Sequence, residues 1–522
     1  MPHLTRRDLG KLACAAANAP AVAQRNAARR DRPHILFLMT DQHRADCTGA
    51  DGNRVVRTPH IDRIAREGVL FRRAYSSTPT CTPARTALLT GLSPWHHGML
   101  GMIGMAERYP LEKPHALRDA GYYTMSVGKQ HFNPMRNGHG YHRMVLDEHC
   151  VCGLGPQGVA ASPQRMLERC DYESWFWSEA PHLDPHATEL WWNDYPARAF
   201  ALPERLHATR WTGDTAVNFL NGYQGGQPFF LKVSFIRPHS PYDPPGRFMK
   251  MYQDAPLPEA FAGRWAARNE ARNSDRDDIW RGKLSPAEIR RSRQGYYGSV
   301  SYVDEQVGRI LEALEKRGLL DETLILFTSD HGDMTGDHNL WRKSYAYESS
   351  ARVPMLMRWP TGLISAPRGQ VMDQPVELRD VLPTFLEAAG RPAPRPIDGR
   401  SLLSLVKSRG AGWREFIDLE HNICYSPENH WNALTDGRWK YIFHALHGEE
   451  QLFDLASDPH ELQDLAGEPA REGELRRWRQ RLVEHFAERG EPFLKNGKLG
   501  LRPESQMTSP HFPLLPGAGK AG

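Results

Sequence analysis

The sequence predicts an α/β fold in which helices flank a largely parallel central sheet, followed by a smaller C-terminal domain with an antiparallel sheet and a helix. Three observations support this prediction. Residues 34–39 and 323–328 are continuous apolar runs, which are typical of strands buried on both faces. Helical patterns alternate with such runs, which favours a parallel sheet. A strong hairpin signal lies beyond residue 400.

The strands of the central sheet are expected at residues 34–39, 123–127, 229–235, 323–328 and 353–357. The first strand ends in Thr40-Asp41-Gln42-His43, and the fourth ends in Ser329-Asp330-His331-Gly332. Ligands of open α/β sheets bind beyond the carboxyl ends of the strands. We therefore expect Asp41 and Asp330 at a functional edge of the sheet.

The clearest helix is expected over residues 302–317, with Gly318 as its C-terminal stop. Shorter helices are expected over residues 61–68 and 381–389. One face of the longest helix is apolar and should pack on the sheet. This face consists of Val303, Val307, Ile310, Leu311 and Leu314.

The sequence pattern of the C-terminal part differs from the strand–helix alternation before it. Asp436-Gly437 lies between two strand-like runs and predicts a tight hairpin, residues 451–455 can add a third strand, and residues 472–489 have a helical stripe. The expected organisation is a signal and lead-in over 1–32, a large domain over 33–400 with an irregular insertion at 150–226, a C-terminal domain over 401–490 and an irregular tail over 491–522.

The insertion is rich in aromatic and His side chains. They can be packed against one another, or they can form a substrate rim with aromatic platforms. The cluster contains Trp175, Trp177, Trp191, Trp192, His182, His186 and His207.

Composition excludes several classes of protein. The 522 residues are 40% hydrophobic and 25% charged, which excludes a mainly disordered chain. No run of 18 apolar residues is present, so no membrane-spanning helix is expected. Lys and Arg number 66 against 62 Asp and Glu, a balance that does not favour nucleic acid as a partner. Composition makes no prediction of the oligomeric state.

The N-terminus is typical of an export signal. Arg6-Arg7 precedes a mildly apolar stretch, and Ala21-Val22-Ala23 has the small-residue pattern of a cleavage site. This pattern predicts export to the bacterial periplasm through a twin-arginine signal. The alternative is an Ala-rich disordered tail.

Residues 79–91 contain a candidate reactive thiol. Pro83, at the start of an Ala- and Leu-rich stretch, indicates a helix N-terminus with Cys81 just ahead of it. Such a position favours anions and lowers the pKa of a thiol. Physical reasoning alone leaves two interpretations of Cys81 open, a reactive thiol and a structural one.

These residues also resemble a known family. Cys81-x-Pro83-x-Arg85, followed by an apolar pair, Thr90 and Gly91, resembles the sulfatase signature, and residues 121–129 resemble a second sulfatase pattern. The resemblance implies an alkaline-phosphatase-like fold, with residues 33–400 as the catalytic domain. It further implies hydrolysis of sulfate monoesters and conversion of Cys81 to formylglycine by a formylglycine-generating enzyme.

The family resemblance also implies a metal site. Its ligands would be Asp41, Gln42, Asp330, His331 and the modified Cys81. Oxygen-rich sites favour hard cations. Ca²⁺ is therefore expected, with Mg²⁺ or Mn²⁺ as alternatives.

The remaining site residues carry charge or protons. Arg85 would hold the formylglycine hydrate and the anion, and Lys129 and Lys343 would neutralise sulfate oxygens. His131 would hydrogen-bond the hydrate and accept its proton. His239 is the preferred general acid, with a lysine as the alternative. One hydroxyl of the hydrate would attack sulfur, and deprotonation of the other would release sulfate.

Two other functions are considered. The pairs Asp41-Gln42 and Asp330-His331 also occur in related phosphonate and phosphate monoesterases, so hydrolysis of those esters at the same site is the closest alternative. A protein of another class would bind sugar or sulfate with Cys81 unconverted. The expected substrate is a sulfated small molecule or saccharide.

Overall fold

The structure is a computed structural model that describes residues 32–148, 170–185 and 187–513. Nearly all of the expected export signal in residues 1–32 lies outside this part. The described residues include no helix with the length and apolar character needed to cross a membrane. The same part of the chain has free thiols at Cys47, Cys81, Cys170 and Cys424.

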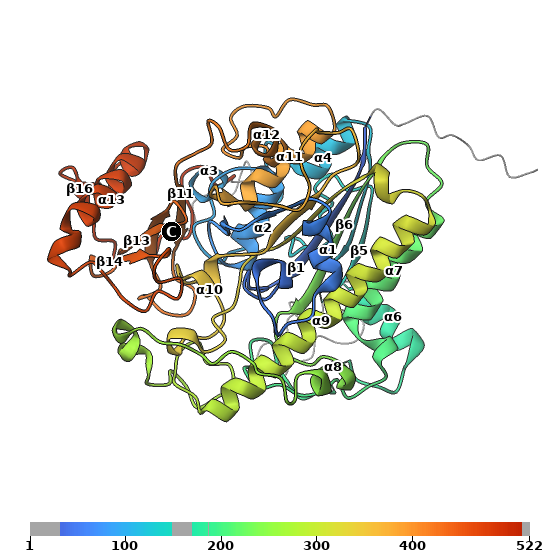
Figure 1. Ribbon diagram of the computed structural model, residues 1–522, viewed down its shortest axis with the longest axis horizontal. Helices are drawn as coiled ribbons and strands as arrows, with labels where there is room; N and C mark the ends of the chain where they lie inside the picture. The colour runs from blue at the N-terminus through green and yellow to red at the C-terminus, as the bar shows by residue number, and fades with distance from the viewer. Residues whose placement is uncertain (1–31, 149–169, 186, 514–522) are drawn as a thin grey trace, which may run out of the picture. The chain divides into compact units, whose positions relative to one another are not determined.

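An eight-stranded sheet forms the centre of the fold (Figure 1), and the predicted fold class is confirmed. Its strands are parallel except β8, which is antiparallel to both of its neighbours. In spatial order the strands are β5 (Arg143–Leu146), β4 (Tyr123–Gly128), β6 (Phe229–Pro238), β1 (His34–Asp41), β7 (Thr323–Ser329), β8 (Met355–Arg358), β2 (Val69–Phe71) and β9 (Gln370–Met372).

Both faces of this sheet are covered, because alternate residues of a strand point to opposite sides. Ile35 and Phe37 of β1 pack on one face, and Leu36 and Leu38 pack on the other. The first face packs against α2 (Cys81–Thr90), α4 (Lys113–Asp119), α11 (Val381–Ala388) and α12 (Leu402–Ser408). The second packs against α1 (Pro59–Arg66), α7 (Ala208–Gly222) and α9 (Pro286–Lys316).

The longest helix extends well beyond its predicted start. It begins at Pro286, behind a capping box formed by Ser285 and Glu288, rather than at residue 302. Its N-terminal half has no continuous apolar stripe, because its buried face mixes small and polar residues such as Gly295 and Ser292 with Tyr296 and Val300. At Gly295 a Cβ atom would lie only 2.4 Å from the Cβ of Ala197. The predicted apolar face of its C-terminal half is buried as expected.

The C-terminal part forms a separate antiparallel sheet. Its strands are β11 (Ile417–His421), β12 (Trp431–Thr435), β13 (Trp439–His444) and β14 (Glu449–Asp454), of which β11 was not predicted. One face of this sheet packs against α13 (Glu472–His485), and the other contacts Leu340, Tyr345 and Tyr347. The segment that carries Lys343 therefore lies between the two sheets.

Short elements complete the described part. Within the segment expected to be irregular, residues 208–222 form the regular helix α7. The short elements are α3 (Pro94–His97), α6 (Asp171–Glu179), α8 (Gly246–Met251), α10 (Glu348–Ala351), β3 (Ala74–Tyr75), β10 (Val376–Glu377), β15 (Leu494–Lys495) and β16 (Lys498–Leu499).

Candidate active site

Four neighbouring parallel strands end at the same edge of the central sheet. The register aligns Thr40 of β1 with Ser329 of β7, and Gly128 of β4 with Ser234 of β6. The residues that close or follow these strands are therefore brought together, as the sheet topology requires. They are Lys129 after β4, His239 after β6, Asp41 and Gln42 at the end of β1, and Asp330 and His331 after β7.

Cys81 lies over this edge. It is the first residue of α2 rather than the residue just ahead of the helix, a small correction to the prediction. Its Sγ atom is 3.3 Å from Nε2 of His331 and 3.9 Å from Oδ1 of Asp41. Burial and Asp41 oppose ionisation, but the charges of Lys343 and Lys129 outweigh them, so the pKa of the Cys81 thiol is lowered. The geometry favours the reactive interpretation of this thiol.

Arg85 ties the acidic groups together from one helical turn beyond Cys81. Its Nε atom donates to Oδ2 of Asp330 at 2.8 Å, and one Nη donates to Oδ2 of Asp41 at 3.1 Å. Nζ of Lys129 lies 2.6 Å from the same oxygen of Asp41. Burial raises the pKa of Asp41, but these cations outweigh it and hold that pKa well below its ordinary value.

The arrangement fits a divalent cation. Ligand atoms of Asp41, Cys81, Asp330 and His331 all lie within 4.8 Å of one another and are buried. Nδ1 of His331 pairs with the carbonyl of Gly332 at 2.9 Å, so the lone pair of Nε2 is turned toward Cys81. Two carboxylates, an imidazole and a nearby amide oxygen form a set of donors that suits a hard cation.

Gln42 has its amide oriented by a residue that we did not predict. Its Nε2 atom donates to Oδ2 of Asp333 at 2.5 Å, which leaves Oε1 to accept from Nζ of Lys343 at 3.1 Å. Gln42 also has a left-handed backbone, with φ of 66°. Asp333 is three residues beyond Asp330, and this spacing was the only sequence signal for it.

His239 and Lys343 form a pair. Nζ of Lys343 is 2.7 Å from Nε2 of His239, whose Nδ1 faces the carbonyl of Ser240 at 2.8 Å. Nδ1 must therefore donate, and Nε2 accepts from the ammonium group. Burial and the charge of Lys343 hold the pKa of His239 well below its ordinary value. Arg342 points elsewhere, because its Nε donates to the carbonyl of Ile279.

His131 lies at the edge of the same charged group. Its backbone is left-handed, with φ of 60°, and its N–H donates to Glu148 at 2.8 Å. Burial and the charges of Lys129 and Arg85 hold the pKa of His131 well below its ordinary value. A neutral imidazole can accept a proton. Glu148 was not predicted, and its place in the sequence carried no signal for this role.

Trp192 covers the cationic side of the site. Its ring is stacked on His239 with 3.5 Å between ring centroids and 14° between the planes. Nζ of Lys129 lies 4.5 Å from the same ring, and Nζ of Lys343 lies 5.4 Å from it. The predicted aromatic cluster signalled this residue without distinguishing it from its neighbours.

Comparisons with known proteins agree with this geometry. A family model described as Sulfatase matches residues 33–391, and one described as N-sulphoglucosamine sulphohydrolase, C-terminal, matches residues 336–488. The chain is 37% identical over 473 residues to an arylsulfatase of Clostridium perfringens, covering 90% of this chain and 97% of that protein. It is 30% identical to a choline-sulfatase of Rhizobium meliloti, covering 84% and 83%.

A solved structure shares the fold. The phosphonate monoester hydrolase of Agrobacterium radiobacter superposes with a TM-score of 0.70 at 24% identity, over 90% of this chain and 100% of that one. At this identity the likeness concerns the fold.

Proposed function

This chain belongs to the sulfatase family and is a sulfuric ester hydrolase, and we propose that it cleaves sulfate monoesters at Cys81 after that residue has been converted to formylglycine. The contact of Cys81 with His331 and Asp41, beyond the ends of β1 and β7, is the observation that carries this proposal. The hydrate of formylglycine would supply two hydroxyl groups on one carbon, one to attack sulfur and one whose deprotonation re-forms the aldehyde and releases sulfate.

Asp41, Gln42, Asp330, His331 and the modified Cys81 would hold a divalent cation, for which we propose Ca²⁺. When bound, the cation would supply positive charge that stabilises the anionic transition state. Arg85 and Lys129 are already in place on the two carboxylates, at 2.8 and 2.6 Å. They hold the acidic groups in one geometry and add positive charge where the sulfate binds.

The leaving oxygen needs a proton, and the pair of Lys343 and His239 holds one. Because Nδ1 of His239 donates to Ser240, the transferable proton lies between Nε2 and Nζ, which are 2.7 Å apart. We propose that this pair is the general acid, with Nε2 of His239 or Nζ of Lys343 delivering the proton. His131, held neutral by its neighbours, would accept the proton that leaves the hydrate.

Maturation and export complete the proposal. A formylglycine-generating enzyme would act on Cys81, and the twin-arginine signal at Arg6-Arg7 would carry the folded protein to the periplasm. The substrate would be a sulfated small molecule or saccharide. Similarity to an arylsulfatase and a choline-sulfatase supports an organic sulfate ester.

Two measurements test this function. The intact mass of the Cys81 peptide from protein made in its native host should show the aldehyde. The kcat/KM for 4-nitrophenyl sulfate should exceed that for 4-nitrophenyl phosphate. A higher value for the phosphate, or for a phosphonate monoester, would favour the alternative reaction, and an unmodified thiol with no hydrolysis would contradict the proposal.

A further inference from the structure

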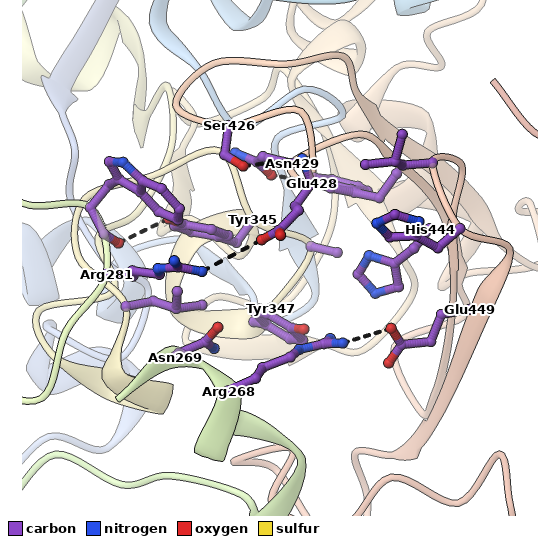
Figure 2. Close-up of a pocket in the computed structure, with 16 residues that line it drawn as sticks. Arg268, Asn269, Arg281, Tyr345, Tyr347, Ser426, Glu428, Asn429, His444 and Glu449 are labelled. Atoms are coloured by element: carbon purple, nitrogen blue, oxygen red, sulfur yellow. Dashed lines mark hydrogen bonds and ion pairs between the residues drawn. The ribbon is translucent and has the colours of Figure 1, made fainter. Parts of the chain in front are cut away.

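A cavity apart from the catalytic residues lies between the central part and the C-terminal sheet (Figure 2), with a volume of about 350 Å³. Its volume is at the lower end of the range for small-molecule sites. The walls come from three segments that are distant in sequence. The first comprises residues 268–269 and 280–281, the second residues 340 and 345–347, and the third parts of residues 426–449, including Glu428, Asn429, Trp431 and Glu449.

The buried part of the cavity is aromatic. Tyr345, Tyr347 and Trp431 are each at least nine-tenths buried, and Trp280 stands half-buried beside them. The hydroxyl groups of both tyrosines are already used, since Tyr345 donates to the carbonyl of Trp280 and Tyr347 donates to Gln451. These side chains therefore offer mainly apolar ring surface to a ligand.

The charged side chains of the rim are paired with one another. Arg268 lies 2.6 Å from Glu449, and Arg281 lies 3.6 Å from Glu428 (Figure 2). Each pair joins the central part of the chain to the C-terminal part. Because two cations face two carboxylates, the rim has no excess of positive charge to attract an anion. It does present donors and acceptors side by side.

Among the residues that line this cavity, two buried donor atoms are unused. Nδ2 of Asn429 and Nε of Arg281 have no hydrogen-bond partner. Asn429 is only 6% exposed, and its Oδ1 accepts from Nε1 of Trp431, which leaves Nδ2 available. A buried donor without a partner is costly, so these atoms indicate a ligand that supplies acceptors.

We propose that this cavity binds an uncharged sugar unit of the substrate. A pyranose ring has an apolar C–H face, which suits the aromatic surface, and hydroxyl groups that both donate and accept. Those hydroxyl groups can accept from Asn429 and Arg281 and donate to the rim carboxylates. A sulfate group would find no unpaired cation there. This inference rests on the proposed function, because it names the substrate class as a sulfated oligosaccharide.

The cavity lies beside the segment that carries Lys343. Lys343 extends into the catalytic centre, and Tyr345 lines the cavity two residues later, so their Cα atoms are at most roughly 7 Å apart. Nε1 of Trp431, from the opposite wall, donates to the carbonyl of Ser344 between them at 3.0 Å. The segment from Lys343 to Tyr345 therefore borders both sites.

Binding is measured without turnover. Wild-type protein is titrated by calorimetry with lactose, cellobiose and N,N′-diacetylchitobiose, and we expect at least one to bind. Trp280→Ala and Asn429→Ala should each weaken that binding about tenfold. Trp280→Phe should restore most of it. Trp191→Ala is the matched control, because Trp191 is 49% exposed and lies outside this cavity. If none of the disaccharides binds, or if Trp280→Ala and Asn429→Ala bind like wild type, the proposal is wrong.

Kinetics then tests whether the sugar belongs to the substrate. With sulfated oligosaccharides, Trp280→Ala should raise KM about tenfold and leave kcat nearly unchanged. With 4-nitrophenyl sulfate, which carries no sugar unit, both constants should stay within about twofold of wild type. Equal KM values on the oligosaccharides would overturn the proposal. If the wild type hydrolyses no sulfate ester, the proposed function is wrong. The calorimetric titration would still show whether the cavity binds a sugar.

Discussion

The catalytic centre and the aromatic cavity border the same segment, yet they differ in how their charged side chains are buried and paired. In the catalytic centre the charged groups are buried: Arg85 contacts the carboxylates of Asp41 and Asp330, Lys129 contacts Asp41, and Lys343 contacts Gln42 and His239. In the cavity the charges lie at a partly exposed rim and are matched in number.

This difference shows what each region can do. Buried charges interact strongly because little water screens them, so cations held in such a site can stabilise an anion and its transition state. Paired charges at an exposed rim contribute little net attraction, so the cavity depends on ring surface and single hydrogen bonds. Changes in the first region should abolish chemistry, whereas changes in the second should alter affinity.

The largest expected effect follows from removal of the nucleophile. Cys81→Ala should lower kcat on 4-nitrophenyl sulfate by roughly 10⁴-fold or more, because no other described group can form the covalent intermediate. Cys424→Ala is the control, since Cys424 is another free thiol and should leave activity within about threefold. Substantial turnover by Cys81→Ala would show that Cys81 does not supply the nucleophile.

Metal removal should have the next largest effect. Dialysis against a chelator should remove the bound cation and reduce kcat at least about a hundredfold, and added Ca²⁺ should restore it. Elemental analysis before and after dialysis measures the ion directly. Disaccharide binding in the aromatic cavity should persist in the metal-free protein. Full activity in protein shown to be free of metal would rule out the proposed cation site.

Asp333→Asn tests the orientation of Gln42. Loss of the carboxylate that accepts from Nε2 should let the amide turn, and it should weaken metal affinity roughly 10- to 100-fold. Asp373→Asn is the control, because Asp373 is exposed. The measurement is a metal titration of activity. An unchanged titration curve would show that Asp333 has no positioning role.

Trp192→Ala tests whether an aromatic ring also contributes to substrate recognition in the catalytic centre. Loss of the ring over His239 should lower kcat/KM for aryl sulfates about five- to tenfold, because the leaving group loses an aromatic partner. Trp191→Ala, a change in its half-exposed neighbour, should stay near wild type. If Trp191→Ala lowers kcat/KM more than Trp192→Ala does, the aromatic contact to the leaving group comes from Trp191 and not from Trp192.

The smallest effect concerns stability and leaves activity unchanged. Lys113 is buried over the ring of Phe37 at 4.4 Å, and burial lowers its pKa from 10.5 to about 7. Between these values the unfolded chain holds more protons, so the free energy of unfolding should rise as pH rises from about 7 to about 10. Lys129 is also buried, but its Nζ atom lies 2.6 Å from Oδ2 of Asp41, so a carboxylate balances its charge.

Lys113→Met should therefore stabilise the protein by roughly 1–3 kcal/mol near pH 7 and flatten this rise. Thermal unfolding at pH 7 and pH 9 measures both effects. Lys407→Met is the control, because Lys407 is half-exposed and paired with Glu387. A wild-type melting temperature that does not change between the two pH values would refute the role of Lys113.

Much of the central fold could be predicted because strands buried on both faces must be apolar along their whole length. That pattern located β1 and β7, and strand ends in a parallel sheet must meet at one edge. The signature around Cys81 then identified the family. The N-terminal half of α9 could not be predicted in this way, because its buried face mixes small and polar residues such as Gly295 and Ser292 with Tyr296 and Val300.

In the candidate site, too, some residues could be predicted from the sequence and others could not. The sequence indicated Asp41, Asp330 and Cys81 through local patterns, since each lies beside a strand end or at a helix start. Trp192 over His239 and the walls of the aromatic cavity depend on contacts between residues tens to hundreds of positions apart. No local pattern encodes such contacts, because the ring of Trp192 meets His239 only when the segment around residue 192 packs beside the end of β6, and the cavity walls form only when the C-terminal sheet packs on the segment that carries Lys343.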